Sequence, residues 1–174
     1  MYLDLPIQQL VRRKDTRFQF GFANEAKDLV PTRDEFVLAA SPKGLHVLAR
    51  NEESLQAPVE VLREVYGPKL EVQPPEVRLI EGVQLQEPIM HVRISTETRY
   101  LDAIKGALDK RGAVPSEEYV RSSYGVLRYE APLSDLLGLP AELALLTSGK
   151  AKHWIVLSHY ALVARDPGPG GRAA

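Results

Sequence analysis

The segment Ser148-Gly149-Lys150 is similar to the end of a phosphate-binding loop, whose motif is G-x-x-x-x-G-K-[ST]. Two motif positions differ, because alanine stands where the first glycine belongs (Ala144) and again after the lysine (Ala151). The local pattern also predicts a helix followed by a strand. A phosphate-binding loop instead leads from a strand into a helix whose backbone N–H groups face the anion. We therefore expect no nucleotide hydrolysis at this segment.

A metal site in this chain would depend on its four histidines, because cysteine is absent. His153 and His159 fall on one face of a predicted strand, but six residues at about 3.3 Å each separate them by about 20 Å. His46 and His91 lie in two other predicted strands, each in a different half of the chain. We expect no metal site and no cofactor.

Paired carboxylates are the other candidates for catalysis. Glu117 and Glu118 are neighbours on a predicted strand, so their side chains point to opposite faces and cannot share acid and base roles. Glu52 and Glu53 precede a predicted helix, where the positive end of the helix dipole favours acids. The chain has no G-x-S-x-G nucleophile motif. We therefore expect a protein that is not an enzyme.

Basic residues gather at a few positions in the second half of the chain, among them Arg121 and Arg128 on the predicted hairpin. Cations at helix ends complement the helix dipole and keep a protein soluble, and acids are interspersed among them. The functional alternative is that they contact RNA phosphates, with Tyr124 or Trp154 stacking on a base, although we expect Trp154 in the core. The candidate RNA-binding residues are Lys110, Arg111, Arg121, Lys150, Lys152 and His153.

The elements predicted for the first half of the chain come first. Phe18, Phe20 and Phe22 alternate and predict a strand over residues 17–23, followed by a short helix over 24–30. We expect a hairpin over 35–50, a helix over 54–66 and a broken edge strand over 70–80.

The second half follows a similar plan. We expect a strand over 87–94, a helix ending at Lys110-Arg111-Gly112, a hairpin over 119–131, a helical segment over 134–149 and a strand over 153–160. The order βαββαβ is that of the split-βαβ, ferredoxin-like fold. The predicted class is therefore α+β, with two tandem ferredoxin-like units whose antiparallel sheets each leave one face free of helices.

We predict four parts along the chain. Residues 1–16 are a lead-in, 17–82 the first unit, 83–163 the second unit, and 164–174 a disordered tail rich in proline and glycine.

Composition limits the functions available to the chain. Its 174 residues are 44% hydrophobic and 26% charged with a net charge of −1, so an RNA partner would require a local basic patch. No apolar run approaches the roughly 20 residues of a membrane span. The start, Met1–Leu5, has no basic stretch followed by an apolar one, so we expect no secretory signal. We expect a cytoplasmic protein that does not contact membranes; the oligomeric state is left open.

Several short motifs resemble the C-terminal domains of translational GTPases of the elongation factor G superfamily. Gly44–Leu48 and the helix after it resemble the G-E-L-H-L segment of domain III, without its glutamate. Residues 87–90, 108–112 and 132–138 resemble domain V in their order and spacing.

Thr147–Gly149 and Ser158–Tyr160 are similar to the BipA/TypA branch of that superfamily. In that branch domain III also joins domain V without a tRNA-mimicking domain between them, as the short linker over residues 81–86 does here. The resemblance implies a module that binds the ribosome, ribosomal RNA or another translation component. The GTPase domain is outside this sequence, so we expect no GTP hydrolysis unless a separate GTPase chain supplies it.

A different class of function is left open by the residues. The two units could form a regulatory or scaffolding pair whose open sheet faces bind a protein partner or a small ligand, which suits the mixed charge and a pI near 6.4.

Overall fold

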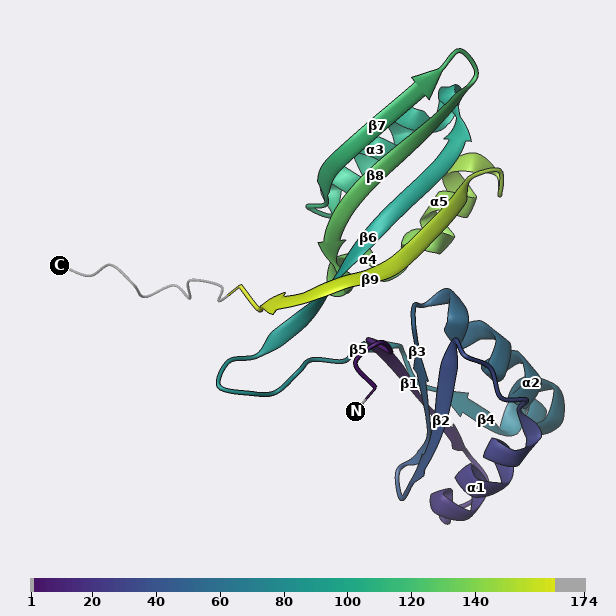
Figure 1. Cartoon of the computed structure of the whole chain (residues 1–174). Helices are drawn as coiled ribbons and strands as arrows, with labels where there is room; N and C mark the ends of the chain where they lie inside the picture. The colour runs from purple at the N-terminus through teal and green to yellow at the C-terminus, as the bar shows by residue number, and fades with distance from the viewer. Residues whose placement is uncertain (1, 165–174) are drawn as a thin grey trace.

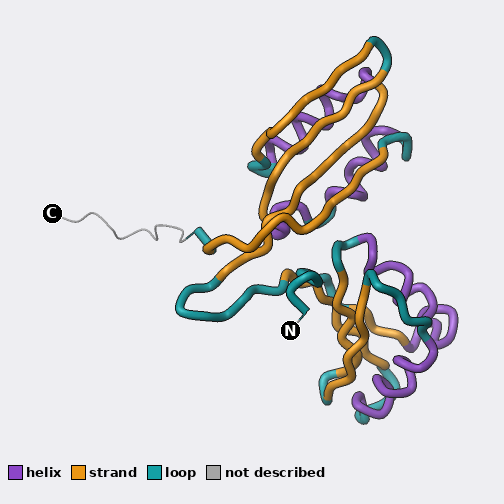
Figure 2. The backbone as a smooth tube through the Cα atoms, viewed as in Figure 1, coloured by secondary structure: helices purple, strands orange, loops and turns teal. Residues whose placement is uncertain are grey.

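Two antiparallel sheets make up the structure, and helices cover one face of each (Figures 1 and 2). The computed structural model describes residues 2–164 of the chain. In each unit the elements follow the order βαββαβ, and the spatial order of the strands is second, third, first, fourth. This is the ferredoxin-like arrangement. The predicted fold class, α+β with two tandem ferredoxin-like units, is confirmed.

The first unit has a sheet in the order β2-β3-β1-β4 with a further short strand, β5, paired with β1. Its elements are β1 (Ile7–Arg13), α1 (Gln19–Leu29), β2 (Phe36–Ser41), β3 (Gly44–Ala49), α2 (Gln56–Tyr66), β4 (Leu70–Val72) and β5 (Glu76–Val77). Short 3-10 turns precede and follow α2 at Glu53–Leu55 and Gly67–Lys69.

Strand β1 is a central strand of this sheet, so the prediction of a lead-in over residues 1–16 was wrong. Its register pairs Ile7 with Ala49 on one side and Val11 with Val72 on the other. Ile7 and Val11 are fully buried. The residues between them are half-buried, and Gln9 donates a hydrogen bond to the carbonyl oxygen of Gln73, so polar residues that suggested a solvated segment belong to the sheet.

Helix α1 occupies the segment over which alternating phenylalanines predicted a strand. Phe22 and Ala26 are buried at helical spacing, whereas Phe18 and Phe20 are exposed by 69% and 43%. A spacing of four residues therefore sets the buried face, and the period of two was coincidental. The strand predicted for residues 17–23 was wrong for this reason.

The turn between β2 and β3 requires a glycine. Gly44 has φ of +142°, and a Cβ atom there would lie 2.5 Å from the carbonyl oxygen of Val11. This close approach lets β1 pair with β3 up to the hairpin turn, at the position where the sequence predicted one.

The second unit has a sheet in the order β7-β8-β6-β9. Its elements are β6 (Gln86–Glu97), α3 (Leu101–Lys110), β7 (Val114–Arg121), β8 (Tyr124–Pro132), α4 (Leu133–Leu136), α5 (Leu139–Thr147) and β9 (Lys152–Leu162), with a 3-10 turn at Thr98–Tyr100 before α3. Alternate residues of β6 and β8 point into the core under α3 and α5. The largest fully buried side chains of this unit, from strands and helices together, are Met90, Ile94, Ile104, Leu108, Leu127, Leu136, Leu139 and Leu143.

The two units contact each other through the segment that precedes α2. The Asn51 side-chain amide donates to the carbonyl oxygen of Ile155 at 3.1 Å, and a Glu52 carboxylate oxygen accepts from the Gly138 backbone N–H at 2.9 Å. At a second point the Tyr160 hydroxyl donates to the carbonyl oxygen of Leu3 at 2.9 Å. Hydrogen bonds therefore join the two units at these two points.

The tail predicted for residues 164–174 lies outside the described residues from residue 165 onward. Within residues 2–164 no helix has the length and apolar character needed to cross a membrane.

Candidate nucleic-acid interface

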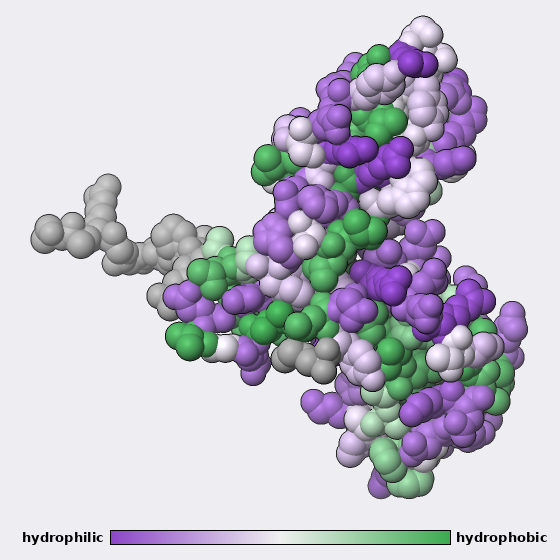
Figure 3. Space-filling model, in the orientation of Figure 1, coloured by the Kyte–Doolittle hydropathy of each residue, from purple (hydrophilic) through white to green (hydrophobic). Residues whose placement is uncertain are grey.

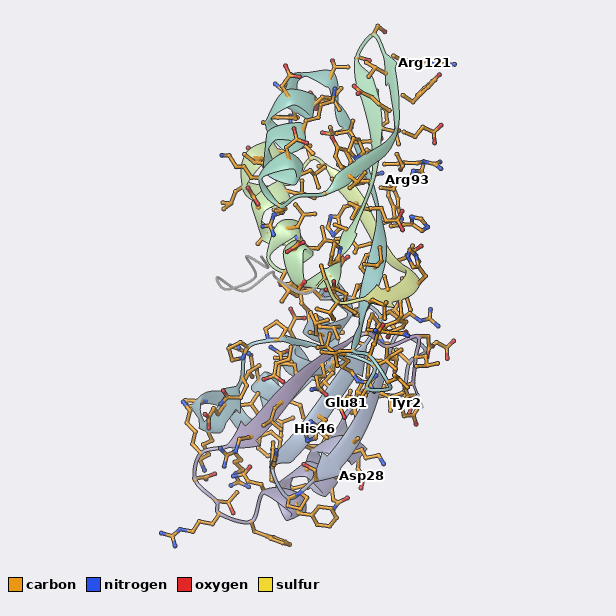
Figure 4. The ribbon with its side chains drawn as sticks, turned by 90° about the vertical axis from the view of Figure 1, so that its left-hand side faces the viewer. Tyr2, Asp28, His46, Glu81, Arg93 and Arg121 are labelled. Atoms are coloured by element: carbon orange, nitrogen blue, oxygen red, sulfur yellow. The ribbon has the colours of Figure 1, made fainter. Side chains whose placement is uncertain are left out.

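The open face of the second sheet carries a straight row of four side chains, one from each strand. Trp154 on β9 lies opposite Arg93 on β6, Arg93 opposite Arg128 on β8, and Arg128 opposite Glu117 on β7. We call these four residues the arginine row. Figure 4 shows Arg93 projecting away from the helices, on the same side of the sheet as Arg121.

The arginine row is accessible and its side chains contact one another. The Arg93 guanidinium lies 5.0 Å from the centre of the Trp154 ring, within the range of a cation–π contact. Arg128 Nη1 is 3.4 Å from a Glu117 carboxylate oxygen. The Trp154 side chain, expected in the core, is 46% exposed. The four side chains of the row line a shallow depression of about 490 Å³.

The neighbouring rows add aromatic and basic groups. One register row joins Lys152, Ser95, Val126 and Tyr119, and the next pairs Glu97 with Tyr124 and Tyr124 with Arg121. The Arg121 guanidinium lies 5.7 Å from the centre of the Tyr119 ring and donates to its hydroxyl. The Ser95 and Tyr124 hydroxyls share a hydrogen bond.

Three of the six predicted RNA-binding residues come together at this end of the sheet. Lys152 begins β9, Arg121 ends β7, and Lys150 lies in the loop before β9 with its Nζ 3.6 Å from Glu97. Acids are present among them, and Figure 3 shows hydrophilic and hydrophobic side chains interspersed on this side of the molecule.

Lys110 and Arg111 lie at the far end of α3, away from this cluster. The Arg111 side chain makes hydrogen bonds within the second unit. Its guanidinium donates twice to a Glu142 carboxylate oxygen, at 2.8 and 3.1 Å, and to the carbonyl oxygens of Asp135 and Leu137 at 2.8 and 2.9 Å. Arg111 therefore connects the end of α3 to the α4–α5 junction, and we assign it a structural role in place of the predicted RNA contact.

His153 faces the first unit instead of the open sheet face. Its Nε2 atom lies 3.4 Å from a Glu53 carboxylate oxygen, and its side chain is 19% exposed. A bulge shifts the register between β6 and β9 at Ile89/Met90, so His159 lies on the opposite face beside Glu130. The expectation that His153 and His159 share a face was wrong because a bulge reverses the alternation.

The match to a family model covers the second unit. Residues 84–169 match the model described as elongation factor G C-terminus. The second unit is an elongation factor G C-terminal-like domain.

Curated relatives match the same part of the chain. Elongation factor G from Cytophaga hutchinsonii is 30% identical over 82 residues, which are 47% of this chain and 12% of the relative. Elongation factor G from Ureaplasma parvum serovar 3 is 31% identical over 77 residues, 44% of this chain and 11% of the relative. The matched segment thus spans about an eighth of the length of these relatives.

The fold of both units recurs in a solved structure. The crystal structure of ttk003000868 from Thermus thermophilus aligns with a TM-score of 0.66 at 13% identity, over 92% of this chain and 41% of that one. At this identity the likeness concerns the fold alone.

Sequence reasoning missed the main exposed feature of this C-terminal-like domain. Arg128 was considered only as a basic residue of the hairpin, and Arg93 was not considered, although the alternation of His91, Arg93, Ser95 and Glu97 along β6 marks one polar strand face. Their alignment into a row depends on the strand register, which the sequence does not specify.

Proposed function

We propose that the chain is a non-catalytic binding module of the translation machinery that associates with the ribosome or ribosomal RNA and does not itself hydrolyse GTP. The match of residues 84–169 to the elongation factor G C-terminus carries the proposal. The cations that gather at one end of that domain, Arg121, Lys150 and Lys152, supply groups suited to phosphate contacts. The setting that this function implies is the cytoplasm.

A finer proposal concerns the branch. In the BipA/TypA-like arrangement suggested by Thr147–Gly149 and Ser158–Tyr160, domain III leads directly into domain V. Here β5 ends at Val77 and β6 begins at Gln86, so no further domain intervenes, which supports that arrangement. A GTPase activity would then come from a part of the protein outside this sequence or from a separate chain.

Co-sedimentation with ribosomes tests the proposal. We expect the chain to pellet with ribosomes at low salt and to dissociate as salt rises, because phosphate contacts release counterions. Lys150→Glu plus Lys152→Glu reverses two charges at the candidate interface and should weaken binding by about tenfold or more. The matched control, Lys27→Glu plus Lys43→Glu, makes the same charge change at exposed positions of the first unit and should have a smaller effect. No association at low salt would refute the proposal.

A second candidate function rests on a depression in the first unit. A cavity of about 780 Å³ lies beside α1 and β2 and is lined by both acids and arginines, including Asp28, Asp34, Arg33 and Arg50. This site supports a regulatory or scaffolding module that binds a small polar ligand or a protein partner. Light scattering after size exclusion and a ligand screen by thermal shift would test it, and a stable oligomer would favour it.

A further inference from the structure

Two arginines occupy directly opposite positions on the open side of the second sheet, and only one of them has a carboxylate partner. Arg93 and Arg128 are directly opposite residues of β6 and β8, and like charges in this position destabilise a sheet. Arg128 has a carboxylate partner in Glu117, whereas Arg93 makes no ion pair within residues 2–164 and contacts only the Trp154 ring with its charge. An anion bound in the depression that both arginines line would supply the counter-charge that Arg93 lacks.

Aromatic rings stand on both sides of this arginine pair. Trp154, Tyr119 and Tyr124 come from three different strands and are 46%, 51% and 46% exposed. Trp154 and Tyr119 are each in a cation–π contact with an arginine of the same face. Such contacts hold a ring in place while leaving part of it free, which is what a stacking platform for bases requires.

We propose that this face binds a single-stranded RNA segment, with a phosphate at Arg93 and Arg128 and bases stacked on Trp154 and Tyr119. The inference rests on the proposed function, since it names a surface and a ligand class for RNA association. Trp154 and Tyr119 are three strand spacings apart across the sheet, about 14 Å, and Tyr119 lies two residues along β7 from the arginine row. An RNA strand that runs from one ring to the other therefore passes beside the arginine pair. A duplex is a poorer ligand, because its bases are already stacked on one another.

Trp154 is the single tryptophan of the chain, so its fluorescence reports on this face directly. We expect a 12-nucleotide oligouridylate to quench the emission with an affinity that falls as salt rises. An RNA duplex of the same length should bind at least tenfold more weakly, and inorganic polyphosphate should not quench. Equal binding of the duplex, or no binding of the oligouridylate, would overturn the proposal.

Variants separate stacking from charge when binding is followed by the anisotropy of a labelled oligouridylate. Trp154→Leu should weaken binding by at least about fivefold, and Trp154→Phe should retain part of the affinity because it keeps a ring. Arg93→Gln should weaken binding by at least about fivefold and flatten the salt dependence. The control Arg63→Gln, on an exposed position of α2, should stay within twofold. Losses as large in the control as at Arg93 would count against the site.

Ribosome co-sedimentation of the same wild-type protein distinguishes the two proposals. If the chain pellets with ribosomes but binds no oligouridylate, the stacking surface is refuted and the proposed function stands. If the chain binds oligouridylate but does not pellet with ribosomes, the proposed function is refuted and the stacking surface stands. A dimer seen by light scattering that masks Trp154 from quenching would make this face a contact between two copies and overturn the RNA assignment.

Discussion

Truncating Arg111 to alanine is expected to destabilise the second unit by about 2–3 kcal/mol. The change removes four hydrogen bonds, two to the Glu142 carboxylate and one each to the carbonyl oxygens of Asp135 and Leu137. A hydrogen bond to a charged group contributes about 1.5–3 kcal/mol when it is shielded from water. The Arg111 and Glu142 side chains are 21% and 38% exposed, so water compensates for part of the loss and the sum of all four bonds is not expected.

Urea denaturation followed by Trp154 fluorescence measures this effect, because Trp154 lies on β9 of the same unit. With a denaturant dependence of about 1–3 kcal/mol per molar urea, the midpoint should fall by about 1 M. Arg111→Lys should recover only part of the loss, because an ammonium group cannot reproduce the planar fork of donors. Lys110→Ala is the matched control, since Lys110 is exposed and should change stability by less than about 0.5 kcal/mol. Equal midpoints for Arg111→Ala and Lys110→Ala would refute the structural role.

Three further predictions concern the first unit and its contact with the second. Gly44→Ala should cost about 2 kcal/mol or more in urea denaturation, because the residue has positive φ and its Cβ would meet the Val11 carbonyl oxygen; wild-type stability would contradict this. Burial lowers the pKa of His46, so the unfolded chain binds the proton more readily and stability should fall as the pH drops below about 6.5. His46→Gln should reduce the loss of melting temperature between pH 7.5 and pH 5. An unchanged loss would mean that other groups cause the pH dependence. Glu52→Ala removes the acceptor of the Gly138 backbone N–H, and hydrogen exchange at this amide should accelerate about fivefold to tenfold; unchanged exchange would mean that the contact does not protect it.

Much of the fold could be predicted because hydrophobic periodicity and turn residues agreed with each other. In the second unit the helix before Gly112, the hairpin and the interrupted helix around Gly138 all occur near their predicted positions. The βαββαβ order followed from these elements, and the sheet order then followed from the ferredoxin-like plan.

Strand β1 and helix α1 were not predicted, because the pattern of apolar residues over residues 7–23 indicated the wrong periodicity. Phe18, just before α1, and Phe20, in its first turn, are large apolar residues that remain exposed, so they carried no information about the buried face. Ile7 and Val11 are separated by polar residues, which masked a central strand whose ends pair with β4 and β5. Tertiary pairing decided both cases.

The candidate interface could be predicted only in part, because it depends on which basic side chains make contacts within the protein and which remain free on its surface. Lys150, Lys152 and Arg121 remain together at one end of the second sheet, whereas Arg111 bonds to the α4–α5 junction and His153 faces the first unit. The bulge at Ile89/Met90 and the register of the arginine row arise from strand pairing and leave no local sequence signal.

Ultraviolet cross-linking of the chain to ribosomes, with the cross-linked peptides mapped by mass spectrometry, tests the central claim most directly. We predict RNA adducts on the second unit, at Tyr119, Tyr124 or Trp154 and near Lys150 and Lys152, that disappear at high salt. Adducts confined to residues 2–80, or none at low salt, would contradict the account.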